Sequence, residues 1–209
     1  MDLLVIRHGQ SEADILNVIE GRADFNLTDL GQQQATLMGE WVSKYMNIDK
    51  IFASPLKRAK QTAEKLSESV GAPVVFFDEL MEWKNGLIAG LDREEANAKY
   101  PMPQPKYPHT AVYEQESDIE FRTRAETALS KIVNENSSDS KIAIISHGGM
   151  INMLFQSFLS LPMGAKIFMS SGDTAVHHWK LDDNDLSKRR IVFINSLVHL
   201  DKLPVSGVL

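Results

Sequence analysis

Short, mostly apolar segments alternate along the chain with longer segments whose apolar residues recur at steps of three or four. A short continuous apolar run is typical of a strand buried in a parallel sheet. The runs that predict buried strands are LLVI (3–6), KIFA (50–53), PVVFF (73–77) and KIAIIS (141–146). Two later runs, TAVHHWKL (174–181) and IVFINSL (191–197), predict strands joined by the polar turn 181–190.

The longer segments predict four amphipathic helices, because their apolar residues return to one face of a helix. They cover about residues 30–45, 59–70, 121–133 and 149–160, and Thr28 is a candidate N-cap for the first. Alternating strands and helices favour a mostly parallel sheet with right-handed crossovers. We therefore predict an α/β fold, a three-layer sandwich with helices on both faces of a mostly parallel central sheet.

One segment breaks this alternation. Residues 100–117, YPMPQPKYPHTAVYEQES, hold four prolines and three tyrosines with no clear period. Proline disfavours both helix and central strand, so we expect an irregular excursion over the surface. No repeat of fixed period is present elsewhere in the chain.

Composition limits the classes of binding partner and of chemical site that we expect. The chain has 209 residues, enough for one domain with a substantial core, and 22 Lys and Arg against 28 Asp and Glu give a net charge of −6. This balance predicts neither a nucleic-acid nor a membrane partner. The absence of cysteine excludes disulfides, thiolate metal sites and a cysteine nucleophile. With no basic leader before an apolar run and no run of membrane-spanning length, we expect a soluble, cytoplasmic protein.

Charged and imidazole side chains follow three of the predicted strands. Arg7-His8-Gly9 ends the first, His147-Gly148 ends the fourth, and Arg58 lies shortly after the second. The carboxyl ends of parallel strands share one edge of a sheet, so we expect these side chains to converge there. The glycines allow close approach of backbone to a ligand, and a helix starting after His147 would aim N–H groups at it. Two arginines and two histidines suit a phosphoryl dianion.

Five blocks of the chain resemble, in order, the signature blocks of the histidine phosphatase superfamily, which includes the phosphoglycerate mutases. The blocks are VIRHGQSE, EGRADFNLTDLGQQQA, IFASPLKRAKQTAE, LMEWKNGLIAGL and IAIISHGGMI, and FINSLVHL resembles the closing strand. The similarity covers nearly the whole chain outside the proline-rich segment. It implies a single domain over residues 1–209, and we expect a lid insert at about 92–120.

The resemblance also implies roles for individual residues. His8 matches the nucleophile, Glu82 the proton donor, and Arg7, Arg58 and His147 the phosphate pocket. Further residues implied or expected to bind the substrate are Gln10, Ser11, Asp14, Gly21, Trp83 and Gly148. The implied activity is hydrolysis of a small phosphorylated metabolite through a phosphohistidine, with no metal and no cofactor. The oligomeric state is left open.

Two departures from the mutases favour a phosphatase. The mutases carry an Arg-His-Tyr run after the donor Glu, where this chain has Trp83-Lys84-Asn85. They also carry a bulkier insert between that Glu and the second His-Gly, whereas here only residues 83–146 separate Glu82 from His147. A small, open lid would admit water to the phosphohistidine. Three alternatives stay open: a mutase, a phosphate-binding pseudoenzyme and a metal-dependent hydrolase.

The remaining histidines have structural interpretations. His177 and His178 are neighbours on a predicted strand and so face opposite sides, which argues against a shared metal site. We expect one to face the core and the other to be exposed. His199 is interpreted as a structural histidine near the end of the last strand.

Asp14 is the residue that departs from the family pattern inside the expected pocket. The family usually has an asparagine there, whose amide can donate to a phosphate oxygen, whereas a carboxylate can only repel one. Asp14 could instead turn away to pair with a cation such as Arg22, or face a cationic group on the substrate, and Asn17 could supply the missing amide. We expect Asp14 to line the pocket and to lower its affinity for phosphate.

Overall fold

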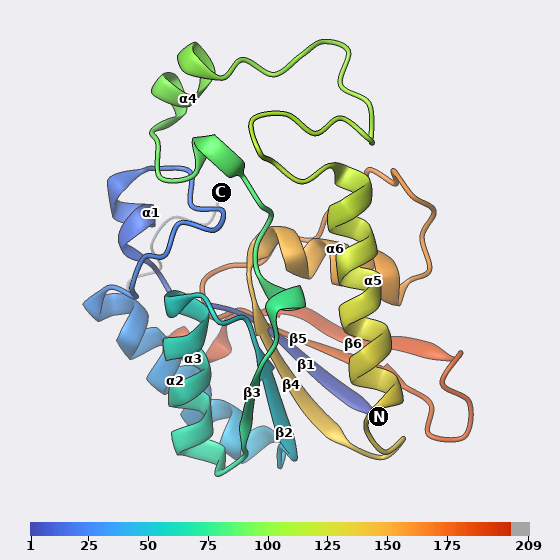
Figure 1. The fold of residues 1–209 in the computed structure, drawn as a ribbon. Coiled ribbons are helices and arrows are strands. Elements are labelled where there is room, and N and C mark those ends of the chain that lie inside the picture. Colours follow the sequence, from blue (N-terminus) through green and yellow to red (C-terminus); the bar gives the residue numbers. More distant parts are fainter. Residues whose placement is uncertain (202–209) are drawn as a thin grey trace.

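A single six-stranded sheet organises the computed structural model, which describes residues 1–201 (Figure 1). The strands are β1 (Asp2–Arg7), β2 (Lys50–Ala53), β3 (Val74–Phe76), β4 (Lys141–Ser146), β5 (Val176–Leu181) and β6 (Arg189–Ser196). They lie in the order β3-β2-β4-β1-β5-β6, in which β3, β2, β4 and β1 are parallel and β5 and β6 are antiparallel to their neighbours. The predicted α/β fold with a mostly parallel sheet is confirmed.

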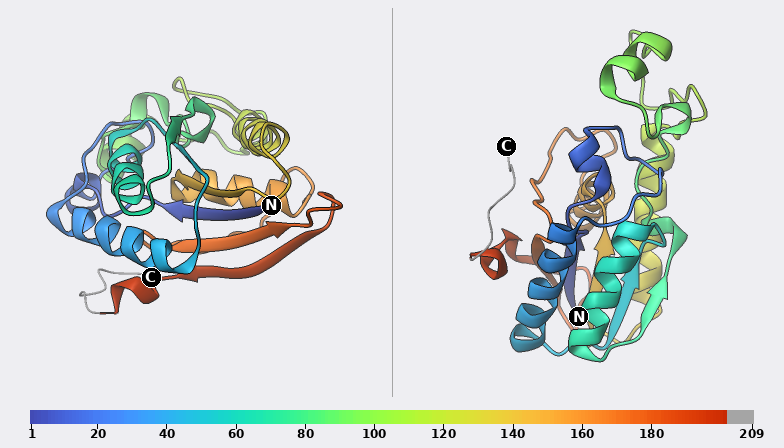
Figure 2. Two further views of the ribbon diagram at one scale, coloured as in Figure 1. Left: turned by 90° about the horizontal axis from the view of Figure 1, so that it is seen from below. Right: turned by 90° about the vertical axis from the view of Figure 1, so that its left-hand side faces the viewer.

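Helices cover both faces of the sheet, as Figure 2 shows. The helices are α1 (Glu12–Leu16), α2 (Asp29–Tyr45), α3 (Lys57–Val70), α4 (Arg93–Lys99), α5 (Asp118–Asn134) and α6 (Gly148–Phe158). Three short 3₁₀ turns are η1 (Asp78–Leu80), η2 (Gly86–Ile88) and η3 (Val198–Leu200). The four predicted helices correspond to α2, α3, α5 and α6. Thr28 caps α2 as expected, since its side chain accepts the N–H of Gly31.

The central strands are buried on both faces because alternate residues enter two separate cores. Leu3 and Val5 of β1 pack with α5 and α6, whereas Leu4 and Ile6 pack with α2 and α3. Ile144 and Ile145 of β4 divide in the same way. Apolar burial on both faces stabilises β1 and β4 and fixes the position of the residues directly after their carboxyl ends.

Two expectations about burial are wrong. The run 73–77 forms only the three-residue strand β3, which is the outermost strand of the sheet built by residues 1–201, and its Val75 and Phe76 are 41% and 44% exposed. His178 is buried, as is His177. The imidazole of His178 bonds to Asp2 Oδ1 at 2.7 Å and to the Tyr45 hydroxyl at 2.9 Å, so a polar cluster rather than solvent satisfies it.

The segment from α4 to the start of α5 rises beyond the end of the sheet where β1 and β4 finish (Figure 1). Residues 100–117 contain no helix or strand, as the proline content predicts. Glu116 holds the far end of this segment, because its carboxylate pairs with Arg124 of α5 and accepts the backbone N–H of Lys84. His199 lies in η3, where its Nε2 is 2.9 Å from the Thr174 hydroxyl.

Candidate active site

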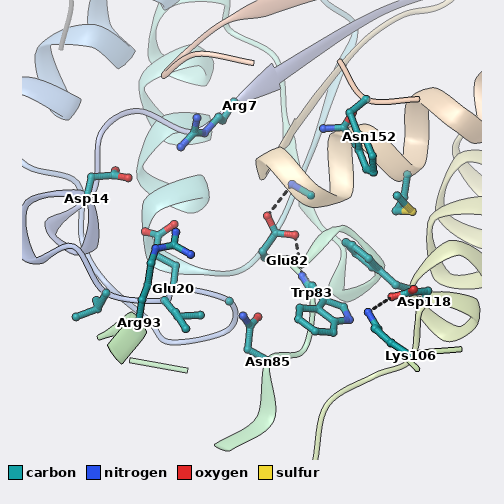
Figure 3. A pocket seen from close by; sticks show the side chains of 17 residues that line it. Arg7, Asp14, Glu20, Glu82, Trp83, Asn85, Arg93, Lys106, Asp118 and Asn152 are labelled. Carbon is teal, nitrogen blue, oxygen red and sulfur yellow. Dashed lines mark hydrogen bonds and ion pairs between the residues drawn. The ribbon is translucent and has the colours of Figure 1, made fainter. Parts of the chain in front are cut away.

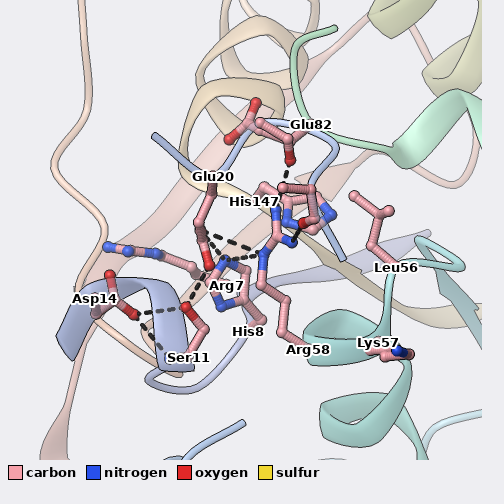
Figure 4. Close-up of polar contacts among 12 residues, drawn as sticks. Arg7, His8, Ser11, Asp14, Glu20, Leu56, Lys57, Arg58, Glu82 and His147 are labelled. Atoms are coloured by element: carbon pink, nitrogen blue, oxygen red, sulfur yellow. Dashed lines mark hydrogen bonds and ion pairs between the residues drawn. The ribbon is translucent and has the colours of Figure 1, made fainter. Parts of the chain in front are cut away.

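Three strand ends bring the predicted side chains together. His8 directly follows β1, His147 follows its parallel neighbour β4, and Arg58 lies in the first turn of α3 after β2. The two imidazole centroids are 5.1 Å apart. All three side chains are buried, and Figure 4 shows them converging at one point.

The hydrogen bonds of His8 define which ring nitrogen can react. Nδ1 lies 2.7 Å from the carbonyl oxygen of Gly9, and because a carbonyl only accepts, Nδ1 carries the proton. The lone pair is therefore on Nε2, where the Nε–H of Arg58 donates to it at 3.2 Å. Burial, followed by the charges of Arg58 and Arg7, holds the pKa of His8 well below its usual range. His8 is thus a neutral imidazole with a directed lone pair.

Backbone carbonyls of the segment before α2 hold Arg58 in place. Its Nη2 donates to Gly21 O at 2.8 Å and its Nη1 donates to Ala23 O at 3.0 Å. Gly21 has φ +49°, and a Cβ there would lie 1.9 Å from Oδ1 of Asn85. Glycine is therefore required at position 21 both for its backbone conformation and for space.

His147 is held through its other ring nitrogen. Its Nε2 lies 2.8 Å from Ser54 Oγ, which also accepts the N–H of Leu56 at 3.3 Å and can donate its hydroxyl hydrogen to the ring. When Ser54 donates, Nδ1 carries the proton, and this buried Nδ1 has no hydrogen-bond partner among residues 1–201. Burial, with the charge of Arg58 as the next cause, keeps the pKa of His147 well below its usual range.

Glu82 reaches the same site from the segment after η1. Its carboxylate accepts the N–H groups of Gly149 at 2.9 Å and Met150 at 3.1 Å, at the beginning of α6, and that of Trp83 at 2.8 Å. A Cβ at Gly149 would lie 2.4 Å from Glu82 Oε1, whereas one at Gly148 would meet nothing within 4 Å. The close approach of the Glu82 carboxylate therefore requires glycine at position 149, and the expected role of Gly148 toward a ligand stays a prediction.

Arg7 points into the site from the end of β1. Its Nη1 donates to Ser171 O at 2.7 Å, its Nη2 lies 3.4 Å from Asp173 Oδ1, and its buried Nε has no partner among the described residues. Burial raises the pKa of Asp173.

A cavity of about 580 Å³ opens beside these residues (Figure 3). It is lined by Arg7, Asp14, Val18, Ile19, Glu20, Gly21, Glu82, Trp83, Asn85, Arg93, Lys106, Asp118, Phe121, Gly149, Asn152, Met153 and Phe168. The residues expected to bind substrate differ in whether they line this cavity. Asp14 and Trp83 line the cavity, whereas Gln10 Oε1 accepts the Thr28 hydroxyl at 2.9 Å and Ser11 Oγ contacts the carboxylates of Asp14 and Glu20.

The contacts of Asp14 exclude one of the alternatives for it, the pairing with Arg22. Its Oδ2 accepts the backbone N–H of Ser11 at 2.8 Å, as part of the capping box of α1. Arg22 instead donates to Glu82 O at 3.3 Å and lies 3.8 Å from Glu116, so the pairing of Asp14 with Arg22 is wrong. Asn17 ends α1 with φ 53° and is exposed, which fits a role in the turn.

Three residues of the site had no interpretation from the sequence. Glu20 lies 3.3 Å from Arg58 Nε, Ser54 orients His147, and Arg124 donates to Met81 O at 2.6 Å and Glu82 O at 3.0 Å. Ser54 stands at the end of a predicted strand beside the expected edge, a signal that could have identified it. Glu20 and Arg124 carry no such signal, because they reach the site from a loop and from a helix face.

Residues 1–201 hold neither a metal-binding cluster nor a membrane-spanning helix. No group of three or more His, Cys, Asp or Glu side chains in this range is arranged to hold a metal ion. None of the helices in it combines the length and apolar character needed to cross a membrane.

Comparison with known proteins gives consistent matches over most of the chain. The family profile described as the histidine phosphatase superfamily (branch 1) matches residues 3–193. A Bacillus subtilis protein named uncharacterized phosphatase PhoE is 29% identical over 91% of this chain and 97% of its own length. A Saccharomyces cerevisiae broad-specificity phosphatase is 31% identical over 74% of this chain and 68% of its own. The structure of a mycobacterial glucosyl-3-phosphoglycerate phosphatase with VO3 superposes with a TM-score of 0.79 at 25% identity, covering 93% of this chain and 99% of that one.

Proposed function

The chain belongs to the histidine phosphatase superfamily, and on that premise we propose that it hydrolyses phosphomonoesters of small metabolites through a phosphohistidine on His8. The observation that carries the proposal is the state of the His8 ring. Its Nδ1–H is fixed on Gly9 O, and its unprotonated Nε2 faces the guanidinium of Arg58 at 3.2 Å. A neutral, oriented imidazole next to a buried cation is what in-line attack on an anionic phosphorus requires.

The proposed first step is attack of His8 Nε2 on phosphorus. A bond forms between Nε2 and phosphorus as the bond from phosphorus to the leaving oxygen breaks. Arg7 and Arg58 compensate the charge on the equatorial oxygens, and His147 donates to one of them through Nδ1–H. The Nδ1 atom of His147 has no hydrogen-bond partner among residues 1–201, and His147 is only 1% exposed, which supports that role. This donation needs only the neutral ring of His147 and not its protonated form.

Glu82 is the proposed proton donor and acceptor. It gives a proton to the leaving oxygen in the first step and takes one from water in the second, when water attacks phosphorus and the bond to Nε2 breaks. Its anchoring to the beginning of α6 and to Trp83 supports this assignment, because the carboxyl group lines the cavity in a fixed position.

The cavity walls support an organic leaving group in that space. Trp83, Phe121 and Met153 supply apolar surface, and Arg93 and Lys106 supply positive charge from the insert. We propose that residues 92–120 act as the lid of a single domain and select among metabolites. Lys84 is exposed, and Tyr107 stacks on His109 and is not part of the cavity lining, so Trp83 and Lys106 are better placed to contact the leaving group. Trp83-Lys84-Asn85 in place of the Arg-His-Tyr run supports a phosphatase over a mutase.

Asp14 is proposed to weaken phosphate binding from the cavity wall, since a carboxylate there repels a bound anion. Cytoplasmic location and the absence of nucleic-acid and membrane partners stay predictions from composition.

The test is to trap the intermediate. Purified protein in EDTA is mixed with a ³²P-labelled aryl phosphate and denatured during turnover, and the labelled peptide is mapped. We expect an acid-labile, base-stable phosphate on the peptide that contains His8. Turnover that depends on an added divalent cation, or label on another residue, would contradict the proposal. Phosphate binding without turnover of any phosphomonoester would instead support the pseudoenzyme alternative.

A further inference from the structure

Glu20 lies between the cavity and the proposed nucleophile. It lines the cavity, whereas His8, Arg58 and His147 do not and are 1%, 0% and 1% exposed. Its Oε2 is 3.3 Å from Arg58 Nε and 3.8 Å from His8 Nε2, and its Oε1 is bonded to Ser11 Oγ. Figure 4 shows the carboxylate pointing at the same guanidinium and imidazole that a phosphoryl group would have to reach.

The charge around this point is unusual for a site that receives a dianion. With both histidines neutral, the cations beside His8 are Arg7 and Arg58, and each already faces a carboxylate: Arg7 faces Asp173 at 3.4 Å and Arg58 faces Glu20 at 3.3 Å. Asp14 and Glu82 add two more carboxylates to the cavity wall. The Nε–H of Arg58 is donated to His8 Nε2, and the Glu20 carboxylate lies 3.3 Å from the same nitrogen, so a phosphoryl group can approach this end of Arg58 only if the carboxylate moves away.

We propose that Glu20 is an anionic gate that occupies the phosphoryl subsite in the free protein and is displaced from Arg58 when a phosphoryl dianion binds. This inference rests on the proposed function, since it assumes that phosphorus approaches His8 Nε2. A carboxylate at this distance from Nε2 occupies the space that an attacked phosphorus needs. Arg93 of α4 lines the same cavity and is a cation available to the displaced carboxylate, which links the gate to the insert.

The gate sets a threshold for anions. A ligand must offer Arg58 more than a resident carboxylate does, so dianions bind whereas monocarboxylates are excluded. The groups that face Glu20 are Arg7 and His8 at the end of β1, Asp14 of α1 and Arg58 of α3. Burial raises the pKa of Glu20, against the opposing effect of Arg58. Protonation removes the ion pair, so anion affinity should rise as the pH falls.

The experiment measures binding of sulfate and of orthovanadate by calorimetry to the wild-type protein and to Glu20→Gln. Sulfate keeps its charge of −2 over the accessible pH range, so its affinity reports the protein alone. We expect Glu20→Gln to lower the Kd for sulfate about tenfold at neutral pH, because one competing charge is removed. Glu40→Gln, an equal charge change on the exposed face of α2, should leave the Kd unchanged.

The pH dependence separates Glu20 from the histidines. The wild-type Kd should fall with decreasing pH, and the Glu20→Gln Kd should fall less, since the substitution removes one of the groups that can gain a proton there. An unchanged or weaker affinity for sulfate in Glu20→Gln would overturn the gate. A second variant, Glu20→Ala, guards against misfolding of the first. The His8 ring of this variant should be carbethoxylated faster than that of the wild-type protein, and an unaltered rate of this modification would also overturn the gate.

These readouts do not require turnover. If Glu20→Gln binds sulfate more tightly while no phosphomonoester is hydrolysed, the gate stands and the proposed function fails. If hydrolysis proceeds and sulfate binding is unaffected by the substitution, the proposed function stands and the gate fails.

Discussion

The ends of β1 and β4 have nearly the same local sequence but hold their histidines differently. Each strand ends in a polar residue, a histidine and a glycine, and the strands are parallel neighbours with Arg7 opposite Ser146. His8 bonds through Nδ1 to its own next residue and turns Nε2 toward Arg58. His147 bonds through Nε2 to Ser54 and leaves Nδ1 without a partner among residues 1–201. In the proposed mechanism one ring presents a lone pair and the other presents a proton.

The difference arises from the segment into which each strand leads. After β1 the chain enters the loop before α1, so a carbonyl is available beside the ring. After β4 the chain enters α6 immediately, and His147 is its N-cap residue, with φ −123° and ψ 160°. The carbonyls of that segment are engaged in the helix, and the neighbouring β2 supplies Ser54 instead. In the proposed mechanism, a hydrogen-bond partner outside the motif thus decides whether a His-Gly pair supplies a nucleophile or a donor.

The first prediction tests the different roles of the two histidines by removing each imidazole ring in turn. His8→Asn should reduce turnover to background, because no other group offers a lone pair to phosphorus. His147→Asn should slow turnover by about 10² to 10³, the usual loss for one donor to a developing charge, and still form the phosphohistidine. Burst and steady-state kinetics of an aryl phosphate would measure both, with His109→Asn on the exposed insert as the control. Equal losses for the two variants, or a burst that survives in His8→Asn, would contradict the assignment.

The second prediction concerns the carboxyl group held at the beginning of α6. Glu82→Gln should slow hydrolysis of alkyl phosphates by about 10² to 10⁴, since a poor leaving group depends on protonation. The loss for nitrophenyl phosphate should be much smaller in the phosphorylation step, because nitrophenolate leaves without a proton. Stopped-flow phosphorylation rates for the two substrates would measure the difference, and Asp78→Asn, a nearby exposed carboxyl group, is the control. A uniform loss across leaving groups would indicate a positional defect and not a lost acid.

The fold was predictable because burial on two faces leaves a strong pattern. Continuous apolar runs mark β1, β2 and β4, and a three- to four-residue period marks the longer helices. Three features of the fold were not predicted correctly, each for its own reason. β3 has an apolar sequence but lies at an edge, His178 is polar but enclosed with Asp2 and Tyr45, and α1 and α4 are too short for a period to emerge.

The local pattern predicted convergence only for residues at or shortly after the end of a strand, and Glu82 was assigned by the resemblance. His8 and His147 directly follow their strands, and they meet because β1 pairs with β4 in parallel. Glu20 lies in a loop, and in the sequence EGRADF it has the pattern of a solvent-exposed carboxylate. Its contact with Arg58 depends on how residues 17–27 fold back over the strand ends, which no local periodicity encodes.

The third prediction, with the smallest change in rate, concerns the hydrogen bond between Ser54 and His147. Ser54→Ala removes the hydroxyl that keeps the proton of His147 on Nδ1, so part of the population should shift it to Nε2 and lose the donor. The rate should fall about fivefold, the value of one hydrogen bond near 1 kcal/mol. The deficit should narrow as the pH decreases, because an imidazolium carries a proton on Nδ1 whichever tautomer preceded it, and burial with Arg58 places that pKa well below the usual range. The ¹⁵N shifts of the His147 ring report the protonated nitrogen directly. A wild-type ring protonated on Nε2, or a Ser54→Ala deficit that is independent of pH, would show that Ser54 does not set the tautomer.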